Sequence, residues 1–207
     1  MVNGVVYQYR ALPMGLTSSP RIFTRVIKVI KEYVQKLGVT LYLYLDDWLV
    51  QAHSWDLVAQ HTNFLVQVAQ GLGWIVNVDK SELDPTQTIV FLGYMYMMDR
   101  GLVRPSPDRW DKIQAILPLF LEKKYLPARM WQSAIGLLAS TEKLVPLGML
   151  HLRPLQLSLG DQWSQFRGKQ SDLVYISQEV KEEVEWWLRE ENTLRGVVVN
   201  RNTEKVP

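Results

Sequence analysis

The chain has 207 residues, of which 47% are hydrophobic and 21% charged, and its formal net charge is +2. This composition is typical of a globular protein and excludes a wholly disordered chain, a collagen-like repeat and a coiled-coil rod. The absence of cysteine excludes disulfides, thiolate metal sites and a cysteine nucleophile. No run of 18 apolar residues occurs, and the first residues lack the basic start and apolar stretch of a signal peptide. We therefore expect an intracellular protein with no membrane contact.

The first predicted elements are a strand and a long amphipathic helix. Residues 5–10 alternate between polar and β-prone side chains, which predicts a strand. Ser19 and Pro20 form a helix start, because serine is a good N-cap and proline suits the first helical position. Apolar residues then recur at helical spacing as far as Leu37, and Gly38 ends the helix.

A polar pair separates the next two apolar runs. Residues 41–45 and 48–52 are both β-prone, and Asp46 and Asp47 lie between them. Two strands joined by a two-residue polar turn predict a β-hairpin. Three further elements are predicted after it: a helix over 56–72, a short strand over 74–78 and a strand over 89–97 with Gly93 in its middle.

The composition changes after about residue 104, where prolines punctuate a segment with helical periodicity. Helices are predicted near residues 107–123, 128–142 and 177–191. The stretch over residues 160–171 is polar and is predicted to be a loop, and the polar tail after Asn192 is predicted to be loose.

The aspartate pair is the sharpest chemical feature of the sequence. Two crowded carboxylates repel each other, and one protonates unless a cation neutralises both. Mg²⁺ takes hard oxygen ligands and often uses one or two carboxylates together with substrate phosphates. A pair of such ions can activate the attacking oxygen and stabilise the leaving oxygen of a phosphoryl transfer. The alternatives are a solvated turn, since aspartate is common in turns, and a phosphohydrolase with Asp46 as nucleophile.

Four motifs in order resemble those of reverse transcriptases. Tyr44-Leu45-Asp46-Asp47 resembles their YxDD box, and residues 7–23, which contain Leu12-Pro13-Met14-Gly15 and Ser19-Pro20, resemble the LPxG…SPxxF segment before a palm helix. Gly73-Trp74 with Asp79-Lys80-Ser81 resembles the next palm motif, and Phe91-Leu92-Gly93-Tyr94 resembles the primer-grip hairpin. The resemblance covers roughly residues 5–110. Residues 136–140 and 145–156, together with Trp48, resemble the DIRS-like, tyrosine-recombinase group of retrotransposons.

The resemblance implies a role for each matching residue. Asp46 and Asp47 would bind the catalytic Mg²⁺ ions, and Lys80 would lie near the triphosphate and protonate the departing pyrophosphate. Two further sets complete the site: Pro13, Met14 and Gly15 would line the incoming nucleotide and template base, and Leu92, Gly93 and Tyr94 would hold the primer end. The cations expected to touch the nucleic-acid backbone are Lys112, Lys123, Lys124, Arg129, Lys143 and Arg153.

The family pattern is incomplete in this chain. In the family, a third carboxylate comes from a strand upstream of the segment matched by Tyr7, but none of the six residues before Tyr7 is acidic. The fingers would also lie upstream, and a ribonuclease H domain downstream. The resemblance therefore implies an incomplete two-metal site, with the missing upstream fingers and palm segment or a ribonuclease H domain as partners, and little or no activity of the isolated chain.

These observations predict an α+β protein. Residues 1–104 would form part of a right-hand polymerase palm, with an antiparallel sheet and packed helices. Residues 105–192 would form a helical thumb and connection-like region, and residues 193–207 a flexible tail. The expected function is RNA-directed DNA polymerisation on an RNA or DNA template-primer with deoxynucleoside triphosphates. The alternative is a non-catalytic retrotransposon remnant that binds nucleic acid or protein.

Overall fold

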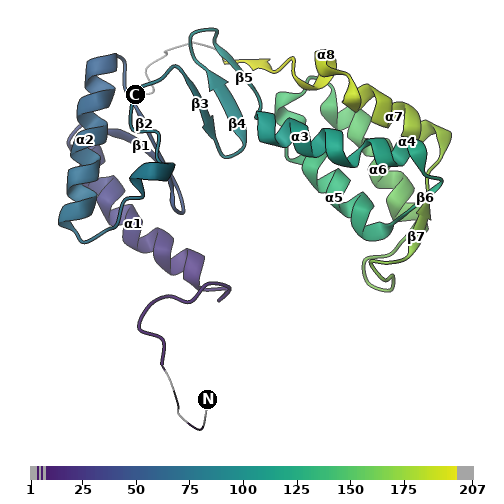
Figure 1. Cartoon of the computed structure of the whole chain (residues 1–207), viewed down its shortest axis with the longest axis horizontal. Coiled ribbons are helices and arrows are strands. Elements are labelled where there is room, and N and C mark those ends of the chain that lie inside the picture. Colours follow the sequence, from purple (N-terminus) through teal and green to yellow (C-terminus); the bar gives the residue numbers. More distant parts are fainter. Residues whose placement is uncertain (1–3, 5, 7, 200–207) are drawn as a thin grey trace. The chain divides into compact units, whose positions relative to one another are not determined.

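The structure is a computed structural model that describes residues 4, 6 and 8–199. The chain divides into two compact units, residues 1–86 and 87–207, and each contains its own hydrophobic core (Figure 1). Both units mix helices with antiparallel strands, so the predicted α+β class is confirmed. The boundary near residue 104, expected from the change in composition and from the family resemblance, stays a prediction. Within the described residues, no helix combines the length and hydropathy needed to cross a bilayer.

The first unit places two helices on one face of a β-hairpin. Its elements are α1 (Ser19–Lys36), β1 (Thr40–Tyr44), β2 (Asp47–Gln51), α2 (Trp55–Gly71) and the 3-10 helix η1 (Val78–Lys80). The cross-strand pairs Leu41–Val50 and Leu43–Trp48 face the core, where they meet Ile30 of α1 and other apolar side chains of both helices. Successive side chains of a strand point to opposite faces, so the other face of the hairpin is not covered by these helices.

Local signals set the two helices of this unit. The helix predicted from Ser19-Pro20 is confirmed as α1, although Ser19 does not cap it: its hydroxyl donates to the Pro13 carbonyl oxygen at 2.8 Å. The helix predicted over 56–72 is confirmed as α2, and the Ser54 hydroxyl accepts a hydrogen bond from the Leu57 N–H at its start. The Ser19 contact ties the preceding loop to α1.

Two predicted strands of the first unit are absent from the described residues. Residues 6 and 8–10 have no strand structure, and Val5 and Tyr7 lie outside the described residues. Residues 74–77 run in an irregular path, and residues 78–80 form η1. A strand needs a hydrogen-bonded neighbour, and the sheet of this unit consists of β1 and β2 in the described part of the chain. A β-prone pattern alone therefore did not produce a strand.

The second unit begins with an antiparallel sheet. Its strands β3 (Thr88–Phe91), β4 (Tyr94–Met97), β5 (Leu102–Pro105) and β8 (Val197–Val198) lie in the order β3-β4-β5-β8. The β-prone run over 89–97 forms a hairpin, as the resemblance of residues 91–94 to a primer-grip hairpin implied. Leu92 and Gly93 have φ values of 53° and 78° and form its two-residue turn. Strand β8 lies in the segment that was predicted to be a loose tail.

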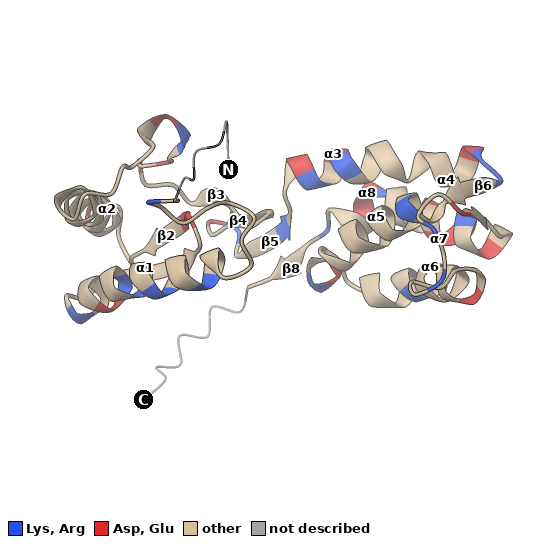
Figure 2. Ribbon diagram, turned by 90° about the horizontal axis from the view of Figure 1, so that it is seen from below, with Lys and Arg blue, Asp and Glu red and all other residues tan. Residues whose placement is uncertain are grey.

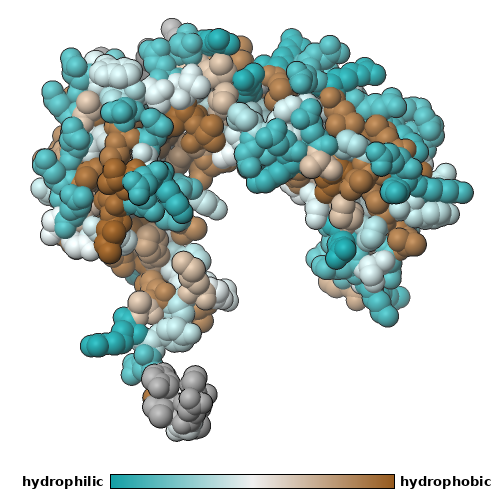
Figure 3. Space-filling model, viewed as in Figure 1, coloured by the Kyte–Doolittle hydropathy of each residue, from teal (hydrophilic) through white to brown (hydrophobic). Residues whose placement is uncertain are grey.

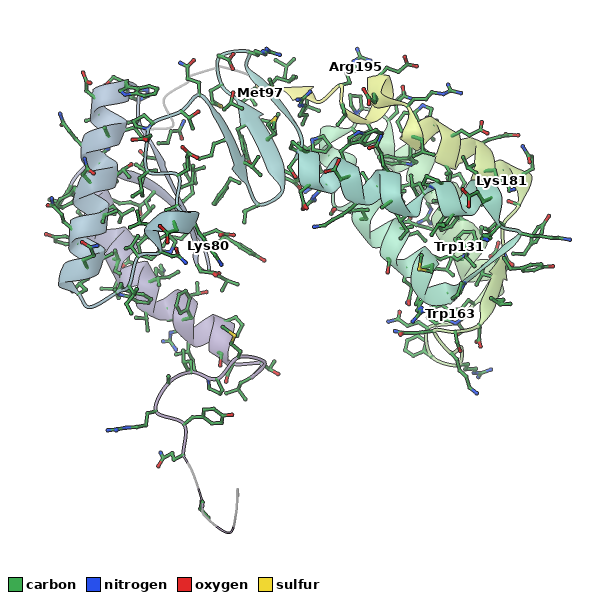
Figure 4. All side chains as sticks on the ribbon, in the orientation of Figure 1. Lys80, Met97, Trp131, Trp163, Lys181 and Arg195 are labelled. Atoms are coloured by element: carbon green, nitrogen blue, oxygen red, sulfur yellow. The ribbon has the colours of Figure 1, made fainter. Side chains whose placement is uncertain are left out.

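The rest of this unit is a layer of packed helices with a small β-ribbon. Its elements are α3 (Pro107–Ile116), α4 (Pro118–Glu122), β6 (Tyr125–Pro127), α5 (Ala128–Ala139), the 3-10 helix η2 (Glu142–Leu144), α6 (Gly148–Gln162), β7 (Leu173–Tyr175), α7 (Gln178–Leu188) and α8 (Glu190–Thr193). Pro118 divides the helix predicted over 107–123, since proline cannot donate the helical hydrogen bond. Helix α6 was not predicted. Trp131 lies inside the helical layer (Figure 4).

Candidate functional site

The aspartate pair lies at the tip of the β1–β2 hairpin. Tyr44 pairs with Asp47, so the two-residue turn consists of Leu45 and Asp46. The sequence predicted a turn made of both aspartates, and the structure shifts it by one residue. Asp46 is therefore a turn residue, and Asp47 is the first residue of β2. Both aspartate side chains are exposed.

The turn has a strained backbone that the hydrophobic core holds in place. Leu45 has a φ of 52°, a left-handed conformation that costs about 1–2 kcal/mol for a residue with a side chain. The indole N–H of Trp48 donates to the Leu45 carbonyl oxygen at 3.1 Å. The Trp48 ring packs against Trp74, with their centroids 6.4 Å apart, and Trp74 meets Phe23 of α1 edge to face. The turn backbone that carries the two carboxylates is thus anchored to the core.

Asp47 belongs to the open face of the hairpin. Strand pairing places it beside Tyr44, and Tyr42 is the next exposed residue of β1 on that face. Tyr44 is 57% exposed and Tyr42 48%, whereas Leu41 on the opposite face is 1% exposed. The carboxylates and two aromatic rings therefore share a surface that a ligand can reach.

The two carboxylates supply part of a metal site. Carboxylate oxygens are ligands that Mg²⁺ prefers, and one or two are enough when substrate phosphates complete the coordination. Asp46 and Asp47 fit that requirement because both are exposed and adjacent. Within the described residues, no group of three acidic or histidine side chains is close enough to hold a metal ion. A complete two-metal cage is not formed by these residues alone.

The other predicted site residues of the first unit lie in loops and in η1. Pro13, Met14 and Gly15 precede α1; Met14 is fully exposed, and Gly15 has a φ of 84°. Lys80 ends η1 and is exposed, and its backbone N–H donates to the Asn77 side-chain oxygen at 3.3 Å (Figure 4). No hydrogen bond between described residues joins Lys80 or the 13–15 loop to the aspartates, so their predicted roles stay predictions.

The Leu92-Gly93-Tyr94 segment lies in the second unit and forms the β3–β4 turn. Arg109 of α3 lies directly against it: a Cβ at Gly93 would overlap the guanidinium group. The guanidinium donates to the Ser140 carbonyl oxygen at 2.9 Å and, at 3.5 Å, to that of Leu92. A φ of 78° favours glycine at this position, and a Cβ here would also force the guanidinium group to shift.

Tyr94 completes this network. Its hydroxyl donates to the same Ser140 carbonyl oxygen at 3.2 Å, and the Arg109 guanidinium carbon lies 5.5 Å from the centre of its ring. The Ser106 N–H donates to the Gly93 carbonyl oxygen at 3.1 Å. Burial raises the pKa of the neighbouring Tyr96 phenol above its usual value, with a smaller contribution from Tyr94. The turn is thereby fixed to α3 and to the end of α5.

Sequence reasoning missed Arg109 and the carbonyl of Ser140. Both act through contacts that are distant in sequence, and a carbonyl leaves no trace in the residue pattern. One signal was available, because an isolated glycine within a strand pattern indicates close approach by another group. Gly93 had that position in the predicted 89–97 strand.

Comparison with known proteins decides what kind of domain carries these turns. Residues 2–96 match the family model described as "Reverse transcriptase (RNA-dependent DNA polymerase)". This part of the chain is therefore similar to a segment of reverse transcriptase domains. The chain is 29% identical over 119 residues to Protein P of duck hepatitis B virus (strain China). It is 31% identical over 113 residues to the retrovirus-related Pol polyprotein from transposon opus of Drosophila melanogaster.

The matches cover a small part of each relative. The viral and transposon alignments each take in 54% of this chain, but only 14% and 11% of the relatives' lengths. A foamy viral protease-reverse transcriptase in complex with double-stranded DNA has the same fold, with a TM-score of 0.69 and 19% identity. That alignment covers 90% of this chain and 29% of the foamy viral one. A second structure of that protein, with an RNA/DNA hybrid, gives a TM-score of 0.61 at 20% identity, over 84% of this chain and 21% of the other.

Proposed function

We propose that this chain contributes to RNA-directed DNA polymerisation by a retrotransposon reverse transcriptase, with Asp46 and Asp47 as its metal-binding carboxylates. The observation that carries the proposal is the β1–β2 turn, whose strained Leu45 is pinned by Trp48 so that both carboxylates stay exposed. Similarity to the transposon opus polyprotein supports a retrotransposon origin. Trp48 and the sequence of residues 145–156 resemble the DIRS-like group, which favours this group among the retrotransposons.

In this proposal Asp46 and Asp47 hold Mg²⁺ at the hairpin tip. When bound, Mg²⁺ stabilises the negative charge that develops during nucleotidyl transfer. The chain's own contribution is position: a turn anchored by Trp48 holds the backbone of both aspartates in place before substrate arrives, which reduces the reorganisation needed at the moment of reaction.

The remaining predicted residues have supporting roles in the same reaction. Pro13, Met14 and Gly15 would contact the incoming deoxynucleoside triphosphate and the template base, and Lys80 would act at the leaving pyrophosphate. Leu92, Gly93 and Tyr94 would hold the primer end of an RNA or DNA template-primer. Exposure of Met14 and the free backbone of Gly15 suit contact with a flat base.

One observation favours the second candidate, a non-catalytic module that binds nucleic acid or protein. Within the described residues, Asp46 and Asp47 have no third acidic partner that would complete a metal cluster. A module of this kind would need neither aspartate. The two candidates differ in whether the aspartate pair binds a divalent cation.

Paramagnetic broadening by Mn²⁺ tests the metal site directly. We expect Mn²⁺ to broaden the amide NMR signals of residues 44–47 first, because it replaces Mg²⁺ at oxygen sites. The double variant Asp46→Asn with Asp47→Asn should lose this broadening. Asp56→Asn, an exposed aspartate in the first turn of α2, is the matched control and should keep it. Equal broadening in the double variant and the wild type would contradict the proposed site.

Primer extension gives the catalytic measurement. We expect the 207-residue chain, given Mg²⁺, template-primer and deoxynucleoside triphosphates, to extend no primer above the level of the double variant. Loss of part of a metal site removes several kcal/mol of transition-state stabilisation, and each ~1.4 kcal/mol is a tenfold change in rate. If the wild-type chain extends a primer and Asp46→Asn abolishes this extension, two carboxylates are sufficient for catalysis.

A further inference from the structure

The β6–β7 ribbon of the second unit carries a pair of exposed aromatic rings. Tyr125 and Tyr175 are cross-strand partners, and their ring centroids are 5.6 Å apart. Tyr125 is 47% exposed and Tyr175 42%, whereas Leu126 and Val174, on the other face, are buried. The alternation of the strands therefore turns both rings outward. We call Tyr125 and Tyr175, together with the neighbouring Lys123, Lys124 and Lys181, the ribbon platform.

The backbone under Tyr175 is held on both sides. Its N–H donates to the Gln162 side-chain oxygen at 2.9 Å, and the Gln162 side-chain nitrogen donates to its carbonyl oxygen at 3.1 Å. On the other side, the Ile176 N–H donates to the Lys124 carbonyl oxygen at 3.0 Å. A ring on a fixed backbone loses little conformational freedom when a ligand stacks on it, which favours binding.

Cations border the rings. A cavity of about 360 Å³ is lined by Glu122, Lys123, Lys124, Tyr175, Ile176, Gln178 and Lys181. Its three lysines and one glutamate give a local charge of 3 − 1 = +2. The Lys181 ammonium donates to the Leu121 carbonyl oxygen at 2.8 Å, which holds it at the edge of the cavity, and Figure 4 labels it on α7. The Lys124 ammonium lies 5.8 Å from the centre of the Tyr125 ring.

We propose that the ribbon platform binds single-stranded nucleic acid, with unpaired bases stacked on Tyr175 and Tyr125 and phosphates beside Lys123, Lys124 and Lys181. Adjacent aromatic rings combined with a positive groove are the features that single strands require. A duplex keeps its bases stacked internally, so it could use the lysines but not the rings. The platform deepens the proposed function by naming a single-strand site, and it does not depend on Asp46 or Asp47.

Two other surfaces of the chain were weaker candidates for a site. An apolar groove between α1 and α2, lined by Tyr33, Val68 and Leu72 among others, leaves hydrophobic residues at the surface of the first unit (Figure 3), but nothing in the described residues indicates its occupant. Basic residues also recur along α1 (Figure 2), but the described residues show no paired aromatic rings among them. The ribbon platform combines rings, cations and a cavity.

Fluorescence anisotropy of a labelled oligothymidylate of about twelve nucleotides tests the rings. The 207-residue chain is used in EDTA, so that divalent cations make no contribution. We expect Tyr175→Ala to raise Kd about tenfold, and Tyr175→Phe, which keeps the ring, to change it by less than about twofold. Tyr33→Ala removes a similarly exposed ring from α1 and should leave Kd unchanged. Circular dichroism checks that each variant is folded.

The salt dependence of the same binding tests the lysines. Each phosphate contact to a single strand contributes about −0.7 to the slope of log K against log[salt]. Lys123→Gln should therefore make the slope shallower by about 0.7. Lys36→Gln, an exposed lysine at the end of α1, is the control and should leave the slope unchanged. An unchanged slope for Lys123→Gln would show that Lys123 does not contact a phosphate.

Three outcomes would overturn the platform: no binding of oligothymidylate by the folded wild type, unchanged Kd for Tyr175→Ala, or equal binding of an abasic oligonucleotide that carries the same phosphates. Preference for duplex over single strand would assign the lysines to duplex contact instead. The Asp46→Asn, Asp47→Asn double variant should bind oligothymidylate as the wild type does. Loss of Mn²⁺ broadening therefore bears on the proposed polymerase site, and loss of oligothymidylate binding bears on the platform.

Discussion

Replacing Trp131 by alanine is expected to lower the free energy of unfolding by about 3–5 kcal/mol, the largest effect of any substitution considered. The Trp131 side chain is completely buried among α4, α5 and their neighbours, and its ring meets Phe120 edge to face with centroids 5.0 Å apart. Truncation to alanine removes this contact and leaves a cavity. Since domains are stable by about 5–15 kcal/mol, this loss is a large fraction of the total stability.

A conservative variant separates the packing of the Trp131 ring from the effect of its indole N–H. The Trp131 indole N–H is buried and has no hydrogen-bond partner among the described residues. Trp131→Phe keeps most of the ring and removes that unpaired N–H, so it should cost clearly less than the alanine change. Trp55→Ala, at a side chain that is 61% exposed, should cost less than about 0.5 kcal/mol. Urea unfolding followed by circular dichroism measures all three, and a loss below about 1 kcal/mol for Trp131→Ala would contradict the expectation.

The elements that the sequence predicted well carry local signals. Helices α1 and α2 have helical periodicity and glycines near their ends, and Ser54 caps α2; these signals act within a few residues. The β-prone segments at 5–10 and 74–78 had the right composition, but a strand depends on a partner that composition does not specify. Helix α6 was missed because Pro154 lies inside it, and proline normally argues against a helix interior.

The candidate site was predictable in outline and not in detail. Two β-prone runs around Asp46 and Asp47 were enough to predict the hairpin. The shift by one residue depends on Leu45 adopting a left-handed conformation, for which turn preferences favour glycine, asparagine or aspartate. That choice is made by the Trp48 hydrogen bond and by packing in the core. Such contacts follow from the tertiary structure rather than from the local sequence.

Replacing Arg109 by alanine is expected to cost about 2–3 kcal/mol, because its hydrogen bonds to the Leu92 and Ser140 carbonyls are lost from a half-buried site. Arg109→Lys should recover only part of this loss, since a single ammonium cannot reproduce the guanidinium fork. Lys112→Ala, on the exposed side of the same helix, removes a surface pair with Asp108 and should cost less than about 1 kcal/mol. Urea unfolding compares the three variants, and equal losses for Arg109→Ala and Lys112→Ala would contradict this role.

A double-mutant cycle with Gly93→Ala shows whether Arg109 acts on the turn itself. In the wild type the added Cβ would have to displace the guanidinium group, as well as adopt a φ of 78°. In an Arg109→Ala background only the backbone cost remains, so Gly93→Ala should be less destabilising there by about 0.5–3 kcal/mol. Hydrogen exchange of the Ser106 amide, which donates to the Gly93 carbonyl, reports the same coupling locally. Additive losses would mean that Arg109 stabilises the helical layer without fixing the turn. Coupled losses would make Arg109 the residue through which α3 and α5 set the position of the proposed primer grip.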